Sequence, residues 1–172
     1  MPDHIEPIPA EPARTAHVVG LAGELAANPL LGDLRADFLD LIAGCGVNVA
    51  FAPGERVISI GDPADAFWVI RHGRVDIELH GAARGTITID RLAAGDILGV
   101  SWIAAPFVSE FDATAVERGS AIRIDAACLR GKCTDDPELG HELYRRFASM
   151  LRQRLRATRM QLLDLYGAPG AN

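Results

Sequence analysis

Short stretches of alternating apolar and polar residues fill the middle of this chain of 172 residues, and they restrict its fold more than any other feature. A period of two is the pattern of a half-buried strand. Turn-forming segments rich in Gly, Pro and Asp separate the stretches at nearly regular intervals. The clearest strand candidates are residues 47–51, 57–60, 67–70, 75–79, 87–92, 111–116 and 121–125. About eight short strands without strand–helix alternation predict a closed β-sandwich or a jelly roll (β-roll) rather than a parallel doubly wound sheet.

Helical patterns flank the strand region, so the chain is predicted to be mainly β with flanking helices. Apolar residues at three- and four-residue spacing over 16–27 and 34–43 predict two short amphipathic helices, the second capped by Asp33. Helix-start signals at 135–138 precede an apolar stripe of about 30 residues. A helix this long outreaches one small domain, so part of it is expected to form a homodimer. The predicted interface residues are Leu143, Phe147, Leu151, Leu155 and Leu162.

These patterns divide the chain into four parts: a tail at 1–13, a helical cover at 14–46, the β-roll at 47–134 and the C-terminal helix at 135–166. The tail carries four prolines and too few apolar residues to offset the entropy of ordering. The sequence begins without the basic start and apolar run of a secretory signal. No uncharged run reaches the roughly 20 residues that span a bilayer. The protein is therefore expected to be cytoplasmic, without a membrane partner.

The net charge and the spacing of the cysteines and histidines argue against nucleic-acid binding and against a metal site. The formal net charge of −6 disfavours a general nucleic-acid binder, because such binding relies on cations that neutralise phosphates. Cys45, Cys128 and Cys133 are an odd number in a chain expected to be cytoplasmic, so they are predicted to be reduced thiols. They also lack the second ligand pair of a zinc site. His72 and His80 are eight residues apart without an H-x-H pair, which favours turn histidines over a metal site. No cofactor or metal is expected.

Four segments resemble the cyclic-nucleotide-binding domain, the effector-sensing module of the catabolite activator protein family and of cyclic-nucleotide-dependent kinases and channels. They are F-A-P-G-E (51–55), I-G-D-P-A-D-A-F-W-V-I (60–70), G-R-V-D-I (73–77) and G-D-I-L-G (95–99). Their order and spacing make the resemblance specific, and it covers roughly residues 30–165. The resemblance implies an eight-stranded β-roll flanked by helices, with a long C-terminal helix that usually dimerises.

The same resemblance places the family's phosphate-binding cassette at residues 95–117. In the family, a glutamate accepts hydrogen bonds from the ribose hydroxyl and an arginine pairs with the cyclic phosphate. Here Gly99 matches the cassette glycine, but Val100 stands at the glutamate position and Asp112 at the arginine position. The whole segment contains no Lys, Arg or His. By family position, the candidate ligand-binding residues are Leu98, Gly99, Val100, Ser101, Trp102, Asp112, Ala113 and Thr114.

Each lost charge-assisted hydrogen bond to phosphate costs about 1.5–3 kcal/mol, and an aspartate facing the anion adds repulsion. The chain is therefore not expected to bind cAMP in the family's usual way. Two readings of single residues stay open. Trp102 and Phe107 could line a pocket for a flat apolar ligand, plug the old pocket or simply pack in the core. Asp112 could bind a cation or a hydroxyl-rich ligand, or be hydrogen-bonded to loop amides.

Three functions follow. The first is a non-enzymatic regulatory or interaction protein that acts through contact with another protein. The second is a sensor of a different small molecule, or of an atypical cyclic nucleotide, in the altered pocket. The third is a cupin-type metalloenzyme. Six residues follow Tyr166, where the family's transcription factors carry a helix-turn-helix domain, so direct sequence-specific DNA binding is not expected. The six arginines of the last helix are interpreted as a solvated face.

Overall fold

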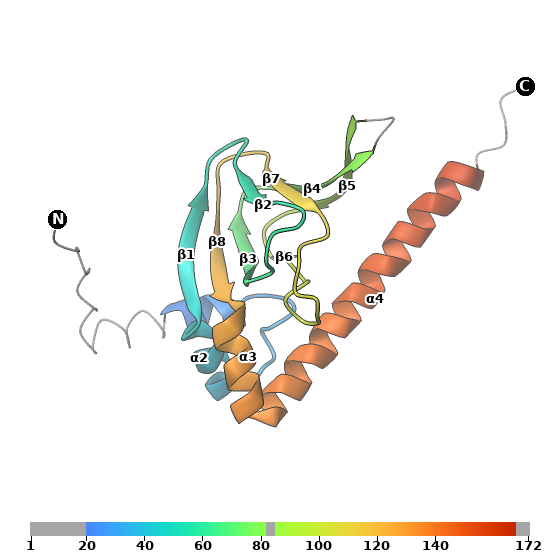
Figure 1. Cartoon of the computed structure of the whole chain (residues 1–172). Helices are drawn as coiled ribbons and strands as arrows, with labels where there is room; N and C mark the ends of the chain where they lie inside the picture. The colour runs from blue at the N-terminus through green and yellow to red at the C-terminus, as the bar shows by residue number, and fades with distance from the viewer. Residues whose placement is uncertain (1–19, 82–84, 168–172) are drawn as a thin grey trace, which may run out of the picture.

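The computed structural model describes residues 20–81 and 85–167, with side chains described up to residue 163. Two four-stranded antiparallel sheets form the body of the molecule (Figure 1), with strand orders β1-β8-β3-β6 and β2-β7-β4-β5. The strands are β1 Gly46–Phe51, β2 Arg56–Ile58, β3 Ala66–His72, β4 Val75–Gly81, β5 Gly85–Leu92, β6 Ile97–Leu98, β7 Asp112–Ala115 and β8 Gly119–Asp125. The predicted β-roll with flanking helices is confirmed.

Strand β8 lies at the centre of the first sheet and pairs with both β1 and β3. Its buried Ile122 pairs with Asn48 on one side and with Val69 on the other. The turn that leads into β8 needs glycine, because a Cβ at Gly119 would lie 2.5 Å from the carbonyl oxygen of His72. This close approach packs the β3–β4 turn against the β7–β8 turn and closes that end of the roll.

The second N-terminal helix is shorter than the sequence pattern predicted, whereas residues 16–19 of the first, like the predicted tail at 1–13, lie outside the described residues. Residues 20–26 are helical, and α2 spans Ala36–Ala43. Asp33 does not cap α2; the helix follows Arg35, which makes no side-chain cap, and the carboxylate of Asp33 instead pairs with Arg146 of the last helix. A distant ion pair therefore replaces the predicted local cap.

Residues after β8 form a helix that the sequence analysis assigned to the β-roll. This helix, α3, spans Ala126–Asp135, and the Asp125 side chain caps it by accepting a hydrogen bond of 2.7 Å from the Cys128 amide. Its buried residues are Ala126, Leu129 and Cys133. Only one of them is a large apolar residue, so the helical period was too weak to recognise.

The last helix, α4, spans Pro137–Gly167 and packs its first half into the core. The side chains of Leu139, Leu143 and Phe147 are fully buried. Phe147 meets Phe67 and Trp102 edge to face, with ring centroids 5.3 Å away in both pairs. Leu143 and Phe147 were predicted at a dimer interface, which is wrong, because they are buried within their own chain. Trp102 likewise fills the core.

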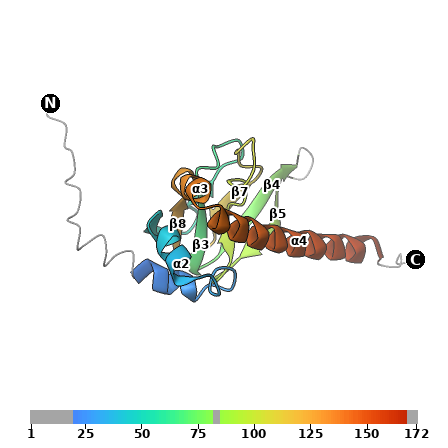
Figure 2. The ribbon, with the colours of Figure 1, turned by 90° about the horizontal axis from the view of Figure 1, so that it is seen from below.

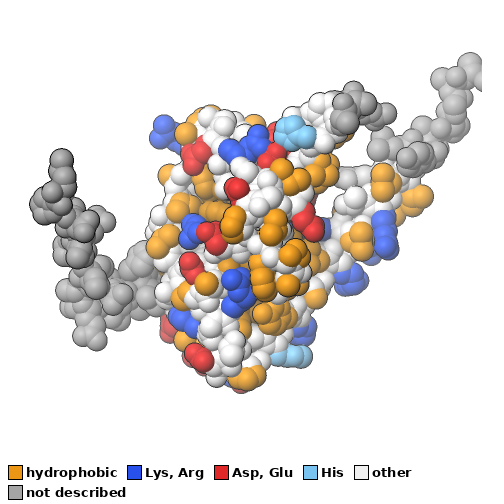
Figure 3. Space-filling model, in the orientation of Figure 1, with side chains coloured by type: hydrophobic (Ala, Val, Ile, Leu, Met, Phe, Trp, Pro, Cys, Tyr) orange, Lys and Arg blue, Asp and Glu red, His pale blue; other side chains and the backbone are white. Residues whose placement is uncertain are grey.

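The second half of α4 is exposed and leads away from the β-roll, which is clearest in the view from below (Figure 2). Its 31 residues make a rod of about 46 Å at about 1.5 Å per residue. Leu151, Leu155 and Leu162 are 39%, 50% and 46% exposed. Apolar and basic side chains both occur on this free part (Figure 3). Because these three leucines are exposed, their place in the predicted dimer interface stays a prediction.

A disulfide joins Cys45 to Cys128, which corrects the prediction of three reduced thiols. Cys45 immediately precedes β1, and Cys128 lies in α3, just after β8. Because β1 and β8 run antiparallel, with Gly46 opposite Ile124, the two cysteines meet although they are 83 residues apart. Cys133 is buried as a free thiol. Over the part of the chain described, no helix is long and apolar enough to cross a membrane.

Candidate functional site

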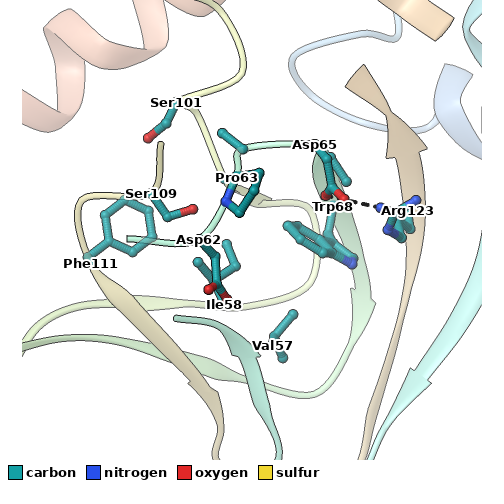
Figure 4. Close-up of a pocket in the computed structure, with 13 residues that line it drawn as sticks. Val57, Ile58, Asp62, Pro63, Asp65, Trp68, Ser101, Ser109, Phe111 and Arg123 are labelled. Carbon is teal, nitrogen blue, oxygen red and sulfur yellow. Dashed lines mark hydrogen bonds and ion pairs between the residues drawn. The ribbon is translucent and has the colours of Figure 1, made fainter. Parts of the chain in front are cut away.

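A cavity of about 310 Å³ opens between the two sheets, beside the segment that the sequence analysis singled out (Figure 4). Its walls come from β2, from the connection between β2 and β3, from the start of β3, from the residues after β6 and before β7, and from β8. The lining residues are Val57, Ile58, Asp62, Pro63, Ala64, Asp65, Ala66, Trp68, Gly99, Ser101, Ser109, Phe111 and Arg123. Several distant parts of the sequence therefore meet around one space.

Backbone hydrogen bonds hold two walls of the cavity together. The Ser109 amide donates to the Asp62 carbonyl at 2.8 Å, and the Gly61 amide donates to the Ser109 carbonyl at 2.8 Å. The Ala64 amide adds a third bond of 2.8 Å, to the Phe107 carbonyl. Residues 107–109 thus run beside residues 61–64 like a short pair of strands. This pairing holds the end of the 95–117 segment against the cavity.

Arg123 is the only Lys, Arg or His that lines the cavity within the described chain. Its guanidinium lies 3.1 Å from Asp65 Oδ1 and 6.0 Å from the centre of the Trp68 ring. Asp62 lines the same cavity, so one cation faces two carboxylates. Arg123 was not among the residues predicted from the sequence, because it lies on β8, outside the 95–117 segment. A usable signal existed in the sequence, since Arg123 interrupts the apolar residues Ala121, Ile122 and Ile124 of β8.

Two serine hydroxyls face the cavity without partners. Ser109 is only 7% exposed, and Ser101 is half-buried. Within the residues that the structure covers, neither hydroxyl has a hydrogen-bond partner, and both residues line the cavity. Figure 4 draws both serines beside Pro63, with Phe111 and Trp68 among the same group of side chains. Hydrogen-bonding groups and aromatic surface are therefore available to a ligand.

The first half of the predicted ligand-binding set divides between cavity and core. Gly99 and Ser101 line the cavity. A Cβ at Gly99 would lie 3.2 Å from the Ala66 carbonyl oxygen and from the Trp68 ring, and the φ angle of Gly99 is +81°, so this position favours glycine. Leu98 and Trp102 are fully buried in two different clusters of the core, and Val100 packs against the cluster that contains Trp102.

The second half of the set lies on β7, where the two sides of the strand have different surroundings. Ala113 is fully buried and packs into the core between the sheets. Because side chains alternate along a strand, Asp112 and Thr114 lie on the opposite face. Thr114 Oγ1 donates to Glu78 Oε2 at 2.8 Å. None of these three residues lines the cavity; the neighbouring Phe111 does.

Asp112 is held in a polar cluster on that outer face. Its Oδ1 accepts a hydrogen bond of 2.8 Å from the Ile60 amide, and its Oδ2 lies 2.6 Å from Arg56 Nη1 and 3.0 Å from His80 Nδ1. The Ile60 amide first and the Arg56 guanidinium second hold the pKa of Asp112 below its ordinary value, against an opposing effect of desolvation. The expectation that Asp112 faces a bound anion is therefore wrong. Its carboxylate accepts from a loop amide, the second reading that the sequence left open.

The histidines considered for a cupin-type site lie apart. His80 contacts Asp112, and His72 lies exposed at the end of β3. In residues 20–81 and 85–167, no three His, Cys, Asp or Glu side chains are grouped so as to hold a metal ion. Phe107 packs under the Arg130 guanidinium, 4.5 Å from its ring centre, rather than in the cavity.

A second contact joins the cassette region to α4. Arg154 Nη2 donates a hydrogen bond of 2.6 Å to the Ile97 carbonyl oxygen, and both residues border a cavity of about 350 Å³ between α4 and the roll. Desolvation lowers the pKa of Arg154. Ile97 is two residues before Gly99, which lines the first cavity. The cavity wall and the last helix are thus linked over a very short stretch of chain.

Comparison with known proteins assigns the family. The family model described as "Cyclic nucleotide-binding domain" matches residues 48–136. A CRP-like cAMP-activated global transcriptional regulator of Mycobacterium tuberculosis is 29% identical over 117 residues, which cover 68% of this chain and 50% of the regulator. The chain spans about half the length of the first curated relatives it matches.

Among solved structures, a cyclic nucleotide-binding domain from Methylobacillus flagellatus aligns with a TM-score of 0.74 and 19% identity, over 92% of this chain and 88% of that one. The regulatory subunit of a cAMP-independent protein kinase A from Trypanosoma cruzi, bound to guanosine, aligns with a TM-score of 0.62 and 20% identity, over 77% of this chain and 50% of that one. These likenesses support the fold. With the family model covering more than half of its residues, the chain belongs to the cyclic nucleotide-binding domain family.

Proposed function

We propose that this chain is a non-enzymatic regulatory module that acts through protein contact and does not bind cAMP in the family's usual way. The observation that carries the proposal is the cation content of the cavity. Arg123 is the one cation at its wall in the described chain, and Asp65 already pairs with it at 3.1 Å. The 95–117 segment adds no cation, and Phe111 forms its wall where β7 begins.

The electrostatic balance of the cavity disfavours a cyclic phosphate. A phosphate that engages Arg123 has to displace or share Asp65, and it also lies near Asp62. A charge-assisted hydrogen bond to an anion contributes about 1.5–3 kcal/mol, or roughly ten- to 150-fold in affinity. A cavity without that contribution, and with two carboxylates, binds the cyclic phosphate correspondingly more weakly.

The contact between the cavity wall and α4 links the cavity to the surface on which we propose that protein contacts form. The Arg154 contact to Ile97 ties α4 to the strand that enters the cavity wall. A conformational change at Gly99 can therefore reach α4 through the nearby contact of Ile97. The exposed half of α4 carries Leu151, Leu155 and Leu162. We place the homodimer contact, and contact with any other protein partner, on this exposed half.

The arginines of α4 do not require a nucleic-acid partner. Arg145 pairs with Glu142 at 2.9 Å, Arg146 pairs with Asp33 and Glu142, and Arg154 donates to a backbone carbonyl. These in-chain contacts support a structural role for three of the six arginines, while Arg152, Arg156 and Arg159 are exposed. DNA binding is not part of the proposal. The guanosine-bound kinase regulatory subunit supports the idea that this fold serves regulation without cAMP, since that protein is described as cAMP-independent.

Isothermal titration with cAMP and cGMP at about 150 mM salt tests the proposal, because screening removes weak surface binding at that ionic strength. We expect no saturable binding in the micromolar range. Micromolar binding of either nucleotide would show that the cavity works in the family's way.

Two variants sharpen the titration. Phe111→Arg places a cation at the cavity wall and should raise cAMP affinity by at least about tenfold. Val116→Arg introduces the same charge at an exposed position just after β7 that does not line the cavity, and should leave cAMP affinity unchanged. Circular dichroism checks that both variants are folded. Equal effects of the two substitutions would contradict the placement of Phe111 at the wall of the ligand cavity.

A further inference from the structure

We propose that the cavity binds an uncharged ligand that combines a planar ring with hydroxyl groups, of the nucleoside type, in place of a phosphorylated one. The inference rests on the proposed function, since it concerns the same cavity and assumes that cyclic nucleotides are not its ligands. It names the chemical class of the ligand from the groups that line the walls.

The charges at the wall select against anions. The cavity is lined by the cation Arg123 and by the carboxylates of Asp62 and Asp65. Since Arg123 and Asp65 already pair, the Asp62 carboxylate is the remaining charge. Carboxylate oxygens only accept hydrogen bonds, so the complementary groups on a ligand are donors such as hydroxyls.

The unpartnered serines call for the same kind of ligand. Ser109 is more than nine-tenths buried, lines the cavity and has no hydrogen-bond partner within the described residues. The Ser109 oxygen itself keeps contact with the solvent of the cavity, so a ligand that supplies a polar group can take the place of water as its partner. Ser101 presents a second such hydroxyl from the segment after β6. Serine can both donate and accept, which matches a ligand hydroxyl or a ring nitrogen.

Aromatic side chains supply the surface for a planar ring. Trp68 and Phe111 are both half-buried and line the cavity, with the apolar Val57 beside them. Aromatic rings of a ligand and a protein gain from stacked or edge-to-face contact in addition to the area they bury. A volume of about 310 Å³ is at the lower end of the range for small-molecule sites, which runs from about 300 to 1,000 Å³.

Matched pairs of ligands test the inference on the full chain. Titration calorimetry compares adenosine with cAMP, and guanosine with cGMP, so that the members of each pair differ in the cyclic phosphate alone. We expect at least one nucleoside to bind about tenfold or more tightly than its cyclic monophosphate. Binding of neither nucleoside to folded protein, with no cyclic nucleotide binding, overturns this inference and leaves the proposed function standing. Tighter binding of a cyclic nucleotide overturns both.

Three substitutions place the ligand in this cavity. Ser109→Ala removes a hydroxyl that has no partner in the protein, and should weaken nucleoside binding about two- to tenfold. Ser120→Ala is the matched control, because Ser120 lies on β8 but does not line the cavity. Asp65→Asn frees Arg123 and should shift the preference toward the cyclic monophosphate. Equal effects of the two serine substitutions, or an unchanged preference in Asp65→Asn, would contradict the assignment.

Discussion

At the scale of single residues, the difference between Phe111 and Asp112 decides the chemistry of the site. The two are adjacent, but only Phe111 lines the cavity, while Asp112 is bound to the Ile60 amide, Arg56 and His80 on the outer face. A strand reverses the direction of its side chains at every residue. An alignment that is wrong by one position therefore assigns Asp112 to the ligand cavity, although its carboxylate stabilises the outer face of the strand.

The structural role of Asp112 predicts a pH dependence of stability. Because its pKa is lowered in the folded state, the stability that it contributes is present above the unfolded value near 4 and is lost as pH falls through the folded pKa. Asp112→Asn should lower the thermal midpoint at pH 7 by about 3–8 °C and should make stability less dependent on pH below about 4. Thermal unfolding followed by circular dichroism between pH 2 and pH 7 measures both effects, since this range brackets that unfolded value of roughly 4.

Asp135→Asn is the control for this prediction, because Asp135 is an exposed carboxylate at the end of α3. It should leave the midpoint and its pH dependence close to those of the unchanged chain. If Asp112→Asn behaves like this control, the polar cluster around Asp112 contributes nothing to the acid sensitivity of the fold.

At the scale of elements, the disulfide ties the start of β1 to α3. Cys45 and Cys128 close a loop of 83 residues, and α3 in turn packs on α4. Closing a loop of this size restricts the unfolded chain and stabilises the folded one by about 2–4 kcal/mol. The free Cys133 lies within α3 itself, and burial first and Asp136 second raise the pKa of its thiol.

Thiol counting tests this arrangement. Denatured, unreduced protein should react with one equivalent of a thiol reagent, and fully reduced protein with three, because Cys133 is the free thiol among the three cysteines. Cys128→Ser should lower the free energy of unfolding by about 2–4 kcal/mol in urea titration. Three reactive thiols in the unreduced protein would show that the pair is reduced under those conditions.

At the scale of the whole molecule, α4 divides into a half that completes the core and a half that extends beyond it (Figure 1). Leu143 and Phe147 are fully buried, whereas Leu155 and Leu162 are about half exposed, at 50% and 46%. Apolar residues repeated at helical spacing on a free helix are the usual seam of a paired helix. The exposed half is therefore the proposed contact between two copies.

Sedimentation velocity tests that contact. The double variant Leu155→Asp and Leu162→Asp should shift the protein from dimer to monomer, because it places charges in the apolar seam without reaching the core. Gln161→Asp adds a charge at an exposed polar position on the same helix and should leave the dimer intact. A monomeric unchanged chain, or a double variant that still sediments as a dimer, contradicts the proposed interface.

The sequence by itself determined the β-roll, the order of its strands along the chain and the absence of a cation from residues 95–117. Alternating apolar residues and turn residues depend on the local backbone conformation. They therefore predict strands and turns even when the partner of each strand is unknown. Only the tertiary structure decided that Asp112 faces outward, that Arg123 enters the cavity, that Cys45 meets Cys128 and that Leu143 belongs to the core. Each of these depends on strand register or on packing between segments far apart in sequence, and a shift of one residue in register reverses the face of every side chain.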